Sequence, residues 1–198
     1  MAVIFVTGPV SSGKSAFAVR LALESGCDVT YIATAAGSPE DIEWRARLMR
    51  HVRDRPASWR TVETGPMTPQ AQLALFRDAP ATACLLVDSL GTWLETRVAA
   101  RIDLLEIDYN VFASALDDEA AAFVDAMLAS RASIVAVSEQ IGWDVVPMVA
   151  AARLSRDAMG RMVQRLAKRA DHVYLVVAGC AVDLRAIGKP IDDCESPP

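Results

Sequence analysis

The sequence predicts a single α/β domain built on a largely parallel sheet with helices on both faces. Apolar, strand-like runs recur at about 2–7, 28–33, 83–88, 133–138 and 172–178, and helix-like stretches lie between most of them. Such alternation is typical of parallel sheets with crossover helices. At 198 residues, 53% of them hydrophobic, the chain can bury one sizeable core and is rich in residues suited to buried strands.

The C-terminal part of the chain predicts a different kind of strand pairing. The last strand opens with His172, which is expected to be structural or exposed, and it ends before Gly179 and a weaker run over 181–187. These two runs can form an antiparallel hairpin at the sheet edge. No repeat or linker divides residues 1–188, so we expect them to form one nucleotide-binding domain. The short, Pro-containing tail 189–198 is expected to be disordered.

Two further helices are expected. A short helix-like piece lies among three prolines between residues 65 and 80. The long Ala-rich stretch 108–131 predicts a helix that packs on the sheet. Its expected apolar stripe runs through Val111, Ala115, Phe123 and Met127.

Composition limits the classes of partner. The formal net charge of −5 argues against nucleic-acid binding by the whole surface, although a local basic patch remains compatible with it. The four cysteines show neither paired metal spacing nor a short disulfide framework, so reduced thiols in the cytoplasm are expected. The N-terminus enters a strand without a basic leader, and no apolar run reaches the roughly 18 residues of a membrane span.

A glycine-rich loop follows the first strand and precedes a helix-like run over 16–23. Its pattern, G-x-x-x-x-G-K-S, has the strand–loop–helix setting that the Walker A motif requires. The glycines let backbone N–H groups turn toward phosphate oxygens, and the helix N-terminus adds partial positive charge. The lysine can bridge the β- and γ-phosphates, and the serine hydroxyl can hold Mg²⁺. The residues of this predicted nucleoside triphosphate site are Gly8, Pro9, Val10, Ser11, Ser12, Gly13, Lys14 and Ser15.

A carboxylate ends the third predicted strand. Asp88 follows the apolar run 83–87, and the carboxyl end of a buried strand is where Mg²⁺ or its water is held in phosphoryl-transfer sites. Asp88 would lie beside the glycine-rich loop if its strand pairs with the first. Aspartate also often caps the helix that follows a strand, so a capping role stays open.

Residues 38–56 predict a helix that carries a histidine between arginines. Trp44, Arg47, His51 and Arg55 are spaced by three and four residues and share one face. That face can simply be solvated, or paired with acidic residues of the same helix. Guanidinium groups also bind phosphates, and their charge favours the neutral, nucleophilic form of the imidazole. The residues alone leave both interpretations open.

Taken together, these motifs resemble the bifunctional adenosylcobinamide kinase / adenosylcobinamide-phosphate guanylyltransferase family, the CobU/CobP type, over residues 2–187. The most specific match is His-x-x-x-Arg-Pro-x-x-Trp-x-Thr-x-Glu, which runs from His51 to Glu63. Further matches are the glycine-rich loop, Tyr31-Ile32-Ala33-Thr34, the run 86–94 and the C-terminal segments 156–161, 164–167, 170–171 and 175–179. The family is similar to RecA-like P-loop NTPases, so that fold is implied.

The resemblance implies a two-step chemistry. The family phosphorylates the aminopropanol hydroxyl of adenosylcobinamide with ATP or GTP. It then transfers GMP from GTP, through a covalent histidine, to give adenosylcobinamide-GDP with release of pyrophosphate. By position that histidine is His51. The resemblance also implies a homotrimer with sites near subunit boundaries.

Residue roles follow as expectations. Lys14 and His51 are the expected catalytic residues, and Ser15 and Asp88 the expected Mg²⁺ ligands. Arg47, Arg53 and Arg55 are candidates to stabilise charge on the phosphate oxygens. The positions that match the family's guanine-nucleotide segments are Ala33, Thr34, Ala35, Val52, Arg53, Asp54, Arg55 and Glu63.

The chain also departs from the family pattern. The family's Asn-Glu-Val-Gly is here Glu139-Gln140-Ile141-Gly142, its Val-Pro-Glu-Asn is Val146-Pro147-Met148-Val149, and its Asn-Gln-Arg is Val163-Gln164-Arg165. These changes leave the nucleotide motifs in place and alter a second polar cluster, a candidate site for the corrinoid or for kinase chemistry. A divergent member with one activity weakened, or with a different acceptor, therefore stays open. Two further alternatives are a P-loop kinase of another small molecule with a structural His51, and a nucleotide-dependent module without turnover.

Overall fold

The computed structural model describes residues 1–35, 55–102, 108–143, 145–189 and 191. Seven strands form one sheet in the order β3-β2-β4-β5-β1-β6-β7. The strands are β1 (Val3–Gly8), β2 (Asp28–Ala33), β3 (Arg60–Glu63), β4 (Ala83–Asp88), β5 (Ser133–Glu139), β6 (His172–Val177) and β7 (Cys180–Asp183). The described helices are α1 (Lys14–Glu24), α3 (Pro69–Arg77), α4 (Leu90–Ala99), α6 (Tyr109–Leu128), α7 (Ala150–Arg169) and α8 (Leu184–Ile187).

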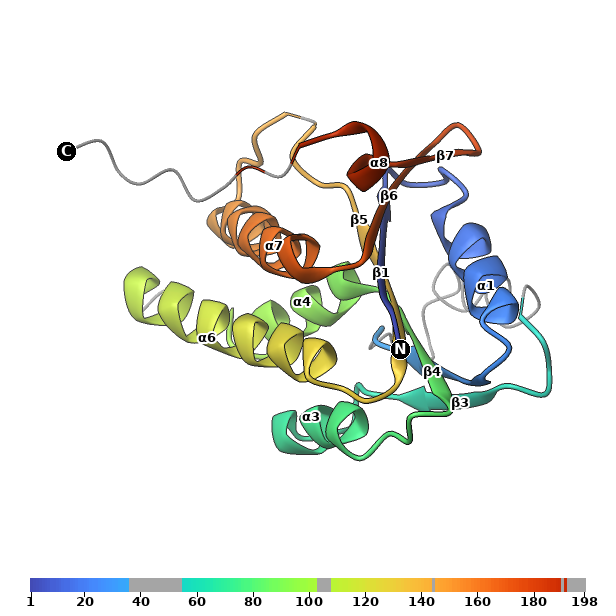
Figure 1. Cartoon of the computed structure of the whole chain (residues 1–198). Coiled ribbons are helices and arrows are strands. Elements are labelled where there is room, and N and C mark those ends of the chain that lie inside the picture. Colours follow the sequence, from blue (N-terminus) through green and yellow to red (C-terminus); the bar gives the residue numbers. More distant parts are fainter. Residues whose placement is uncertain (36–54, 103–107, 144, 190, 192–198) are drawn as a thin grey trace.

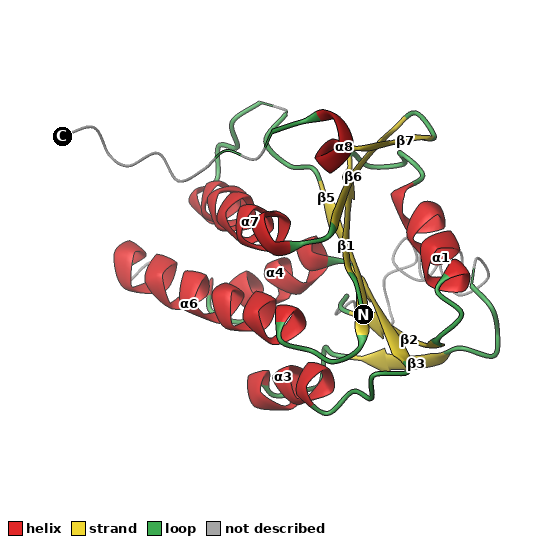
Figure 2. Ribbon diagram, viewed as in Figure 1, coloured by secondary structure: helices red, strands yellow, loops and turns green. Residues whose placement is uncertain are grey.

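The sheet separates two layers of helices. α1 lies on one face, and α3, α4, α6 and α7 lie on the other, as Figure 1 and Figure 2 show. Neighbouring strands run parallel except β6 and β7, which form an antiparallel edge hairpin. The predicted α/β architecture, its five main strands and its edge hairpin are therefore confirmed.

Both edges of the sheet differ from the prediction. β3 is not among the strands that the sequence predicts, because its four residues, Arg60–Glu63, are mostly exposed and carry no apolar run. At the opposite edge the predicted run 181–187 splits. The strand ends at Asp183, whose carboxylate accepts a hydrogen bond from the backbone N–H of Arg185 and caps α8.

The central strands are buried on both faces, as expected for a parallel sheet covered by helices. On the α1 side, Val6, Val137 and Tyr31 pack with Ala18 and Ala22 of the helix. On the other side a larger cluster joins the sheet to the remaining helices, and its largest fully buried side chains include Trp93, Phe76, Phe112 and Phe123. Two hydrophobic cores, a mainly aliphatic one on the α1 side and a larger one rich in aromatic side chains, therefore hold the helical layers to the sheet.

The predicted stripe of α6 is partly wrong. Phe123 and Met127 are buried, but Val111 is 66% exposed and Ala115 is also exposed. A neighbouring row faces the interior instead, toward α7 and α3, and it buries larger aromatic and aliphatic side chains than the predicted row offers. The buried row consists of Phe112, Leu116, Ala120, Phe123, Val124 and Met127.

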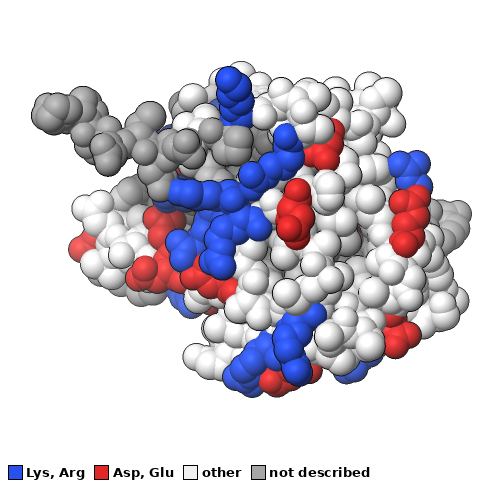
Figure 3. Space-filling model, in the orientation of Figure 1, with Lys and Arg blue, Asp and Glu red and all other residues white. Residues whose placement is uncertain are grey.

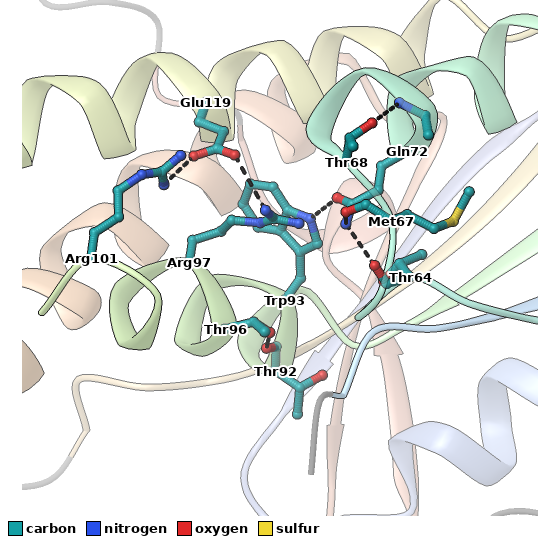
Figure 4. A network of polar contacts seen from close by, with 11 residues as sticks. Thr64, Met67, Thr68, Gln72, Thr92, Trp93, Thr96, Arg97, Arg101 and Glu119 are labelled. Atoms are coloured by element: carbon teal, nitrogen blue, oxygen red, sulfur yellow. Dashed lines mark hydrogen bonds and ion pairs between the residues drawn. The ribbon is translucent and has the colours of Figure 1, made fainter.

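A polar network joins the helices on the larger face (Figure 4). Gln72 of α3 is buried; its side-chain oxygen accepts from Trp93 Nε1 at 2.9 Å, and its amide donates to the Thr64 carbonyl at 2.9 Å. Arg101 and Arg97 both lie against the carboxylate of Glu119 in α6. These contacts hold α3, α4 and α6 together and fix the chain that leaves β3.

Basic side chains gather on the surface of α7 (Figure 3). This helix carries Arg153, Arg156, Arg161, Arg165, Lys168 and Arg169. Two of these arginines form ion pairs with α6, Arg161 with Asp117 at 2.9 Å and Arg165 with Asp125 at 2.6 Å. Much of the patch therefore serves helix packing. Within the described parts of the chain, no helix combines the length and apolarity needed to cross a bilayer.

The structure also shows where the cysteines and His172 lie. Cys27, Cys84 and Cys180 form no disulfide, and Cys194 lies outside the described residues. His172 is exposed at the start of β6, and its Nδ1 lies 2.9 Å from the carboxylate of Asp183. His172 is thus exposed and structural, as predicted.

Candidate nucleotide-binding site

The glycine-rich loop lies between β1 and α1, at the carboxyl edge of the sheet (Figure 1). Gly8 is the last residue of β1, and Gly13 is the N-cap of α1. Gly13 has φ of +96°, a left-handed backbone conformation that residues other than glycine rarely adopt. This turn brings the N-terminus of α1 and the N–H groups of the loop to one place, which is a phosphate-binding arrangement.

Contacts within and behind the loop hold its shape. Ser12 is buried; its N–H donates to the Pro9 carbonyl at 3.3 Å, and its own carbonyl accepts from Gly179 in the β6–β7 turn at 3.0 Å. Lys14 is only 8% exposed, and its ammonium donates to the Pro9 carbonyl at 3.4 Å. The lysine thus folds back over the loop, where a triphosphate could take over its hydrogen bond.

Asp88 does not lie on a strand next to the loop. β5 pairs with β1 on one side and with β4 on the other, so it separates Asp88 from the glycine-rich loop. The condition under which Asp88 would flank the loop directly is therefore not met. At a strand spacing of about 4.8 Å, the ends of β4 and β1 are roughly 10 Å apart across the sheet. A hydrated metal ion and phosphate oxygens can span such a gap.

Tyr31 positions the Asp88 carboxylate. Its hydroxyl donates to Asp88 Oδ2 at 2.9 Å, from the adjacent strand β2. Burial, together with the negative charge of Asp88, holds the pKa of Tyr31 well above its usual value, so the phenol stays a donor at neutral pH. The guanidinium of Arg55 lies 4.1 Å from the centre of the tyrosine ring. An arginine from the histidine segment thus lies beside the carboxylate expected to hold Mg²⁺.

Thr34 and the start of α4 form a hydroxyl cluster. Thr34 Oγ1 donates to the Ser89 carbonyl at 2.6 Å, and it lies 2.6 Å from Thr92 Oγ1. Ser89, rather than Asp88, is the N-cap of α4 and forms a capping box with Thr92. This cluster ties the end of β2 to α4. A nucleotide contact by Thr34 remains a prediction.

Glu139 and Gln140 follow β5 at the loop. Glu139 is in register with Gly8, and the Gln140 N–H donates to the Gly8 carbonyl at 2.9 Å. Ser89 Oγ donates to the Glu139 carboxylate, 3.0 and 2.9 Å from its two oxygens. Sequence reasoning treats these residues as departures from the family pattern, within a polar cluster that is a candidate site for the corrinoid or for kinase chemistry, and assigns neither residue an individual role. The available signal is an acidic residue at the carboxyl end of a buried parallel strand.

The remaining predicted nucleotide residues divide into two groups. Ala33 ends β2 in register with Glu63, which is exposed at the end of the edge strand β3, and Ala35 is exposed just beyond. The carboxyl ends of these strands and the loop therefore lie on one edge of the sheet. The other group lies outside the described residues and consists of Arg47, His51, Val52, Arg53 and Asp54.

The residues at this edge suit Mg²⁺ bound together with a nucleotide. Among the described residues no group of three His, Cys, Asp or Glu could form a metal site of protein ligands alone. Mg²⁺ typically uses one or two carboxylates, waters and substrate phosphates. Ser15, in the first turn of α1, and Asp88, at the end of β4, provide a donor set of that kind.

Comparison with known proteins shows the family of the chain. The family model described as "Cobinamide kinase / cobinamide phosphate guanyltransferase" matches residues 4–184. The chain is similar to the bifunctional adenosylcobalamin biosynthesis protein CobP of Pseudomonas aeruginosa, with 37% identity over 187 residues, 94% of this chain and 98% of the relative. It is also similar to the bifunctional protein CobU of Salmonella typhimurium, with 36% identity over 92% of this chain and 99% of the relative.

A solved structure extends the likeness to the fold. A prototypical ATPase from the type III secretion system of pathogenic bacteria superposes with a TM-score of 0.54 over 95% of this chain and 58% of that protein. At 12% identity this likeness concerns the fold alone. Because the family match and the curated relatives extend over nearly the whole sequence, this chain belongs to the cobinamide kinase / cobinamide phosphate guanyltransferase family.

Proposed function

We propose that the protein phosphorylates adenosylcobinamide with ATP or GTP and then transfers GMP from GTP to the product, giving adenosylcobinamide-GDP. The observation that carries the nucleotide chemistry is the complete phosphate-binding loop at the same sheet edge as Asp88. Family membership supplies the acceptor. Among nucleotide-binding proteins, a P-loop alone does not distinguish a kinase from a switch.

In the first step the acceptor hydroxyl attacks the γ-phosphorus. A new P–O bond forms, the bond to the bridging oxygen breaks, and the electron pair leaves on the β-phosphate of the nucleoside diphosphate. Loop N–H groups and Lys14 hold the triphosphate and neutralise charge on its oxygens. Mg²⁺, held by Ser15 and Asp88, would supply further charge neutralisation when bound with the nucleotide.

In the second step an imidazole nitrogen of His51 attacks the α-phosphorus of GTP, and pyrophosphate leaves. The phosphate oxygen of cobinamide phosphate then displaces the histidine and takes the GMP. Arginines on the same predicted helical face favour the neutral imidazole, and guanidinium groups suit the developing phosphate charge. Arg55, stacked on Tyr31 beside Asp88, supports a position of this segment near the triphosphate.

The chain provides a matched pair of variants for the histidine. The protein is incubated with GTP labelled at the α-phosphate, and the intact mass is measured for one added GMP. Wild type is expected to gain an acid-labile, alkali-stable adduct, as a phosphoramidate should be. His51→Ala should abolish labelling, whereas His172→Ala should leave it, because His172 lies exposed on β6 and contacts Asp183.

Discharge of the adduct tests the acceptor. Added adenosylcobinamide phosphate should remove GMP from the protein and yield adenosylcobinamide-GDP. Labelling of the His51→Ala protein would reject the nucleophile. Phosphorylation of a non-corrinoid without any protein adduct would favour a different small-molecule kinase, and nucleotide binding without transfer would favour a regulatory module.

We further propose that the protein acts in the cytoplasm as a homotrimer. The reasons are its resemblance to a trimeric family and its cysteine usage. Light scattering on the eluting protein tests the assembly; a mass of one chain with full transferase activity would contradict the trimer.

A further inference from the structure

Glu139 occupies a position at the phosphate-binding edge to which no role has been assigned. We propose that its carboxylate accepts the proton of the acceptor hydroxyl when that hydroxyl attacks the γ-phosphorus. The inference rests on the kinase step of the proposed function. It is carried by three features of the fold: the place of β5 in the sheet, the direction of the Glu139 side chain, and the contacts that hold its carboxylate.

Because of the order of strands, Glu139 lies closer to the loop than Asp88 does. β5 lies directly beside β1, and Glu139 is in register with Gly8, where the loop begins. In the pairing of β4 with β5, Asp88 is level with Val137, so Glu139 extends two residues further toward the carboxyl edge. Glu139 therefore lies between the phosphate-binding loop and the carboxylate expected to hold Mg²⁺, which is where a reacting group must come.

The side chain of Glu139 turns toward the start of α4. Along β5, Val135 and Val137 pack into the cluster that includes Ala18 of α1, and Glu139 continues that row. At the carboxyl edge, however, its carboxylate contacts Ser89 and Gly91 at the start of α4, which belongs to the opposite layer of helices. Asp88 directly precedes Ser89, so both carboxylates lie where β4 meets α4.

Residues at the start of α4 bind the Glu139 carboxylate but leave part of its hydrogen-bonding capacity unused. Ser89 Oγ donates to both Glu139 oxygens, at 3.0 and 2.9 Å. Gly91 in the first turn of α4 leaves the necessary room, because a Cβ there would overlap Glu139 Oε2. An ionised carboxylate can accept about four hydrogen bonds, so one hydroxyl from Ser89 leaves capacity for a substrate hydroxyl.

The proton balance is complete within the kinase step. The hydroxyl oxygen forms its bond to the γ-phosphorus, the nucleoside diphosphate leaves with the electron pair of the broken P–O bond, and the proton passes to a Glu139 oxygen. Water takes that proton after the product leaves. No additional reactant is needed. GMP transfer uses a phosphate oxygen as acceptor, which carries no proton that must be removed at neutral pH.

The first experiment measures phosphorylation of adenosylcobinamide with γ-labelled ATP. Glu139→Gln keeps the size and the hydrogen-bond acceptor but loses the basicity, so kcat is expected to fall about 100-fold or more, with little change in KM for ATP. Glu139→Asp should retain part of the rate. Formate should raise the rate of Glu139→Ala, because a small carboxylate can enter the vacated space.

A second variant separates chemistry from stability. Gly91→Ala must displace the Glu139 carboxylate, yet alanine favours a helix more than glycine does, so the melting temperature should hold or rise while kcat falls. A structural role for Glu139 predicts that rate and melting temperature fall together. Retained binding of a non-hydrolysable ATP analogue shows that each variant keeps the nucleotide site.

The outcomes are distinct from those of the proposed function. Wild-type phosphorylation with an unchanged rate in Glu139→Gln overturns the proton acceptor alone. A lowered rate that excess Mg²⁺ restores also overturns it, in favour of a metal role. No phosphorylation of adenosylcobinamide by wild type overturns the proposed function, and this inference with it.

Discussion

Replacing Tyr31 with phenylalanine tests how Asp88 is held. The hydroxyl donates to the Asp88 carboxylate at 2.9 Å, and Tyr31 is 5% exposed. Because burial and the charge of Asp88 keep the pKa of Tyr31 high, the hydroxyl is a donor throughout the neutral range. Tyr31→Phe removes that donor and keeps the ring that packs in the core and beneath Arg55.

The expected loss is about 1–2 kcal/mol in the free energy of unfolding. A hydrogen bond to a charged group contributes about 1.5–3 kcal/mol. Asp88 is only partly buried, so water replaces some of the lost interaction, and phenylalanine spares the cost of burying a hydroxyl. The ring volume is unchanged, which removes any cavity cost. For a chain of this size, the loss corresponds to a fall of about 2–8 °C in the melting temperature.

Urea unfolding of four proteins measures this energy. They are wild type, Tyr31→Phe, Asp88→Asn and the double variant, and their cycle gives the coupling between the two side chains. Tyr174→Phe is the matched control. Tyr174 also packs on the α1 side, with its ring 5.0 Å from that of Phe17, and no described residue hydrogen-bonds to its hydroxyl. The free energy of unfolding of Tyr174→Phe should differ from that of wild type by less than about 0.5 kcal/mol.

Two results would refute this reasoning. One is an equal change in the free energy of unfolding for Tyr31→Phe and Tyr174→Phe. That result would mean that loss of a tyrosine hydroxyl, rather than loss of its hydrogen bond to Asp88, accounts for the change. The other is a coupling near zero in the cycle. A changed slope of unfolding with urea would point instead to an altered unfolded state.

Other changes test the packing of the helices and the edge hairpin. Gln72→Leu leaves the buried Trp93 N–H without its acceptor, at about 1–3 kcal/mol, whereas the Thr64 carbonyl keeps the N–H of Met67. With leucine burial as an offset, the free energy of unfolding in urea should fall by about 1–3 kcal/mol, and an unchanged value would contradict this. The hydrogen bond from His172 lowers the pKa of Asp183 in the folded protein. The ionised Asp183 carboxylate therefore stabilises the fold fully above the pKa of an unfolded aspartate, about 3.9. This stabilisation is lost as the pH falls through the lower pKa of the folded state. The stability gap between wild type and Asp183→Asn should therefore narrow below about pH 4, and a gap independent of pH would exclude this linkage.

Local patterns were sufficient for the parts of the site that are continuous in sequence. The loop from Gly8 to Ser15 is recognisable because strand, glycines, lysine and helix follow one another without interruption. Asp88 is recognisable because it ends an apolar run. β3 is a contrasting case: Arg60–Glu63 is a strand only because β2 lies beside it, and its own residues carry no apolar pattern.

Contacts between distant residues could not be predicted in the same way. The hydrogen bond from Tyr31 to Asp88 spans 57 positions, and that from Ser89 to Glu139 spans 50. No periodicity within a window of a few turns encodes such pairs. The rotation of α6 that exposes Val111 likewise depends on which row fills the space between α3 and α7.

The amino-acid sequence by itself determined the class of fold, the phosphate-binding loop and the family, because each is written in short-range order along the chain. Only the tertiary structure decided that β5 lies between β1 and β4, and therefore that Glu139 stands between the loop and Asp88. Strand order follows from the packing of whole strands and helices against one another, an energy summed over many distant contacts that no single segment contains.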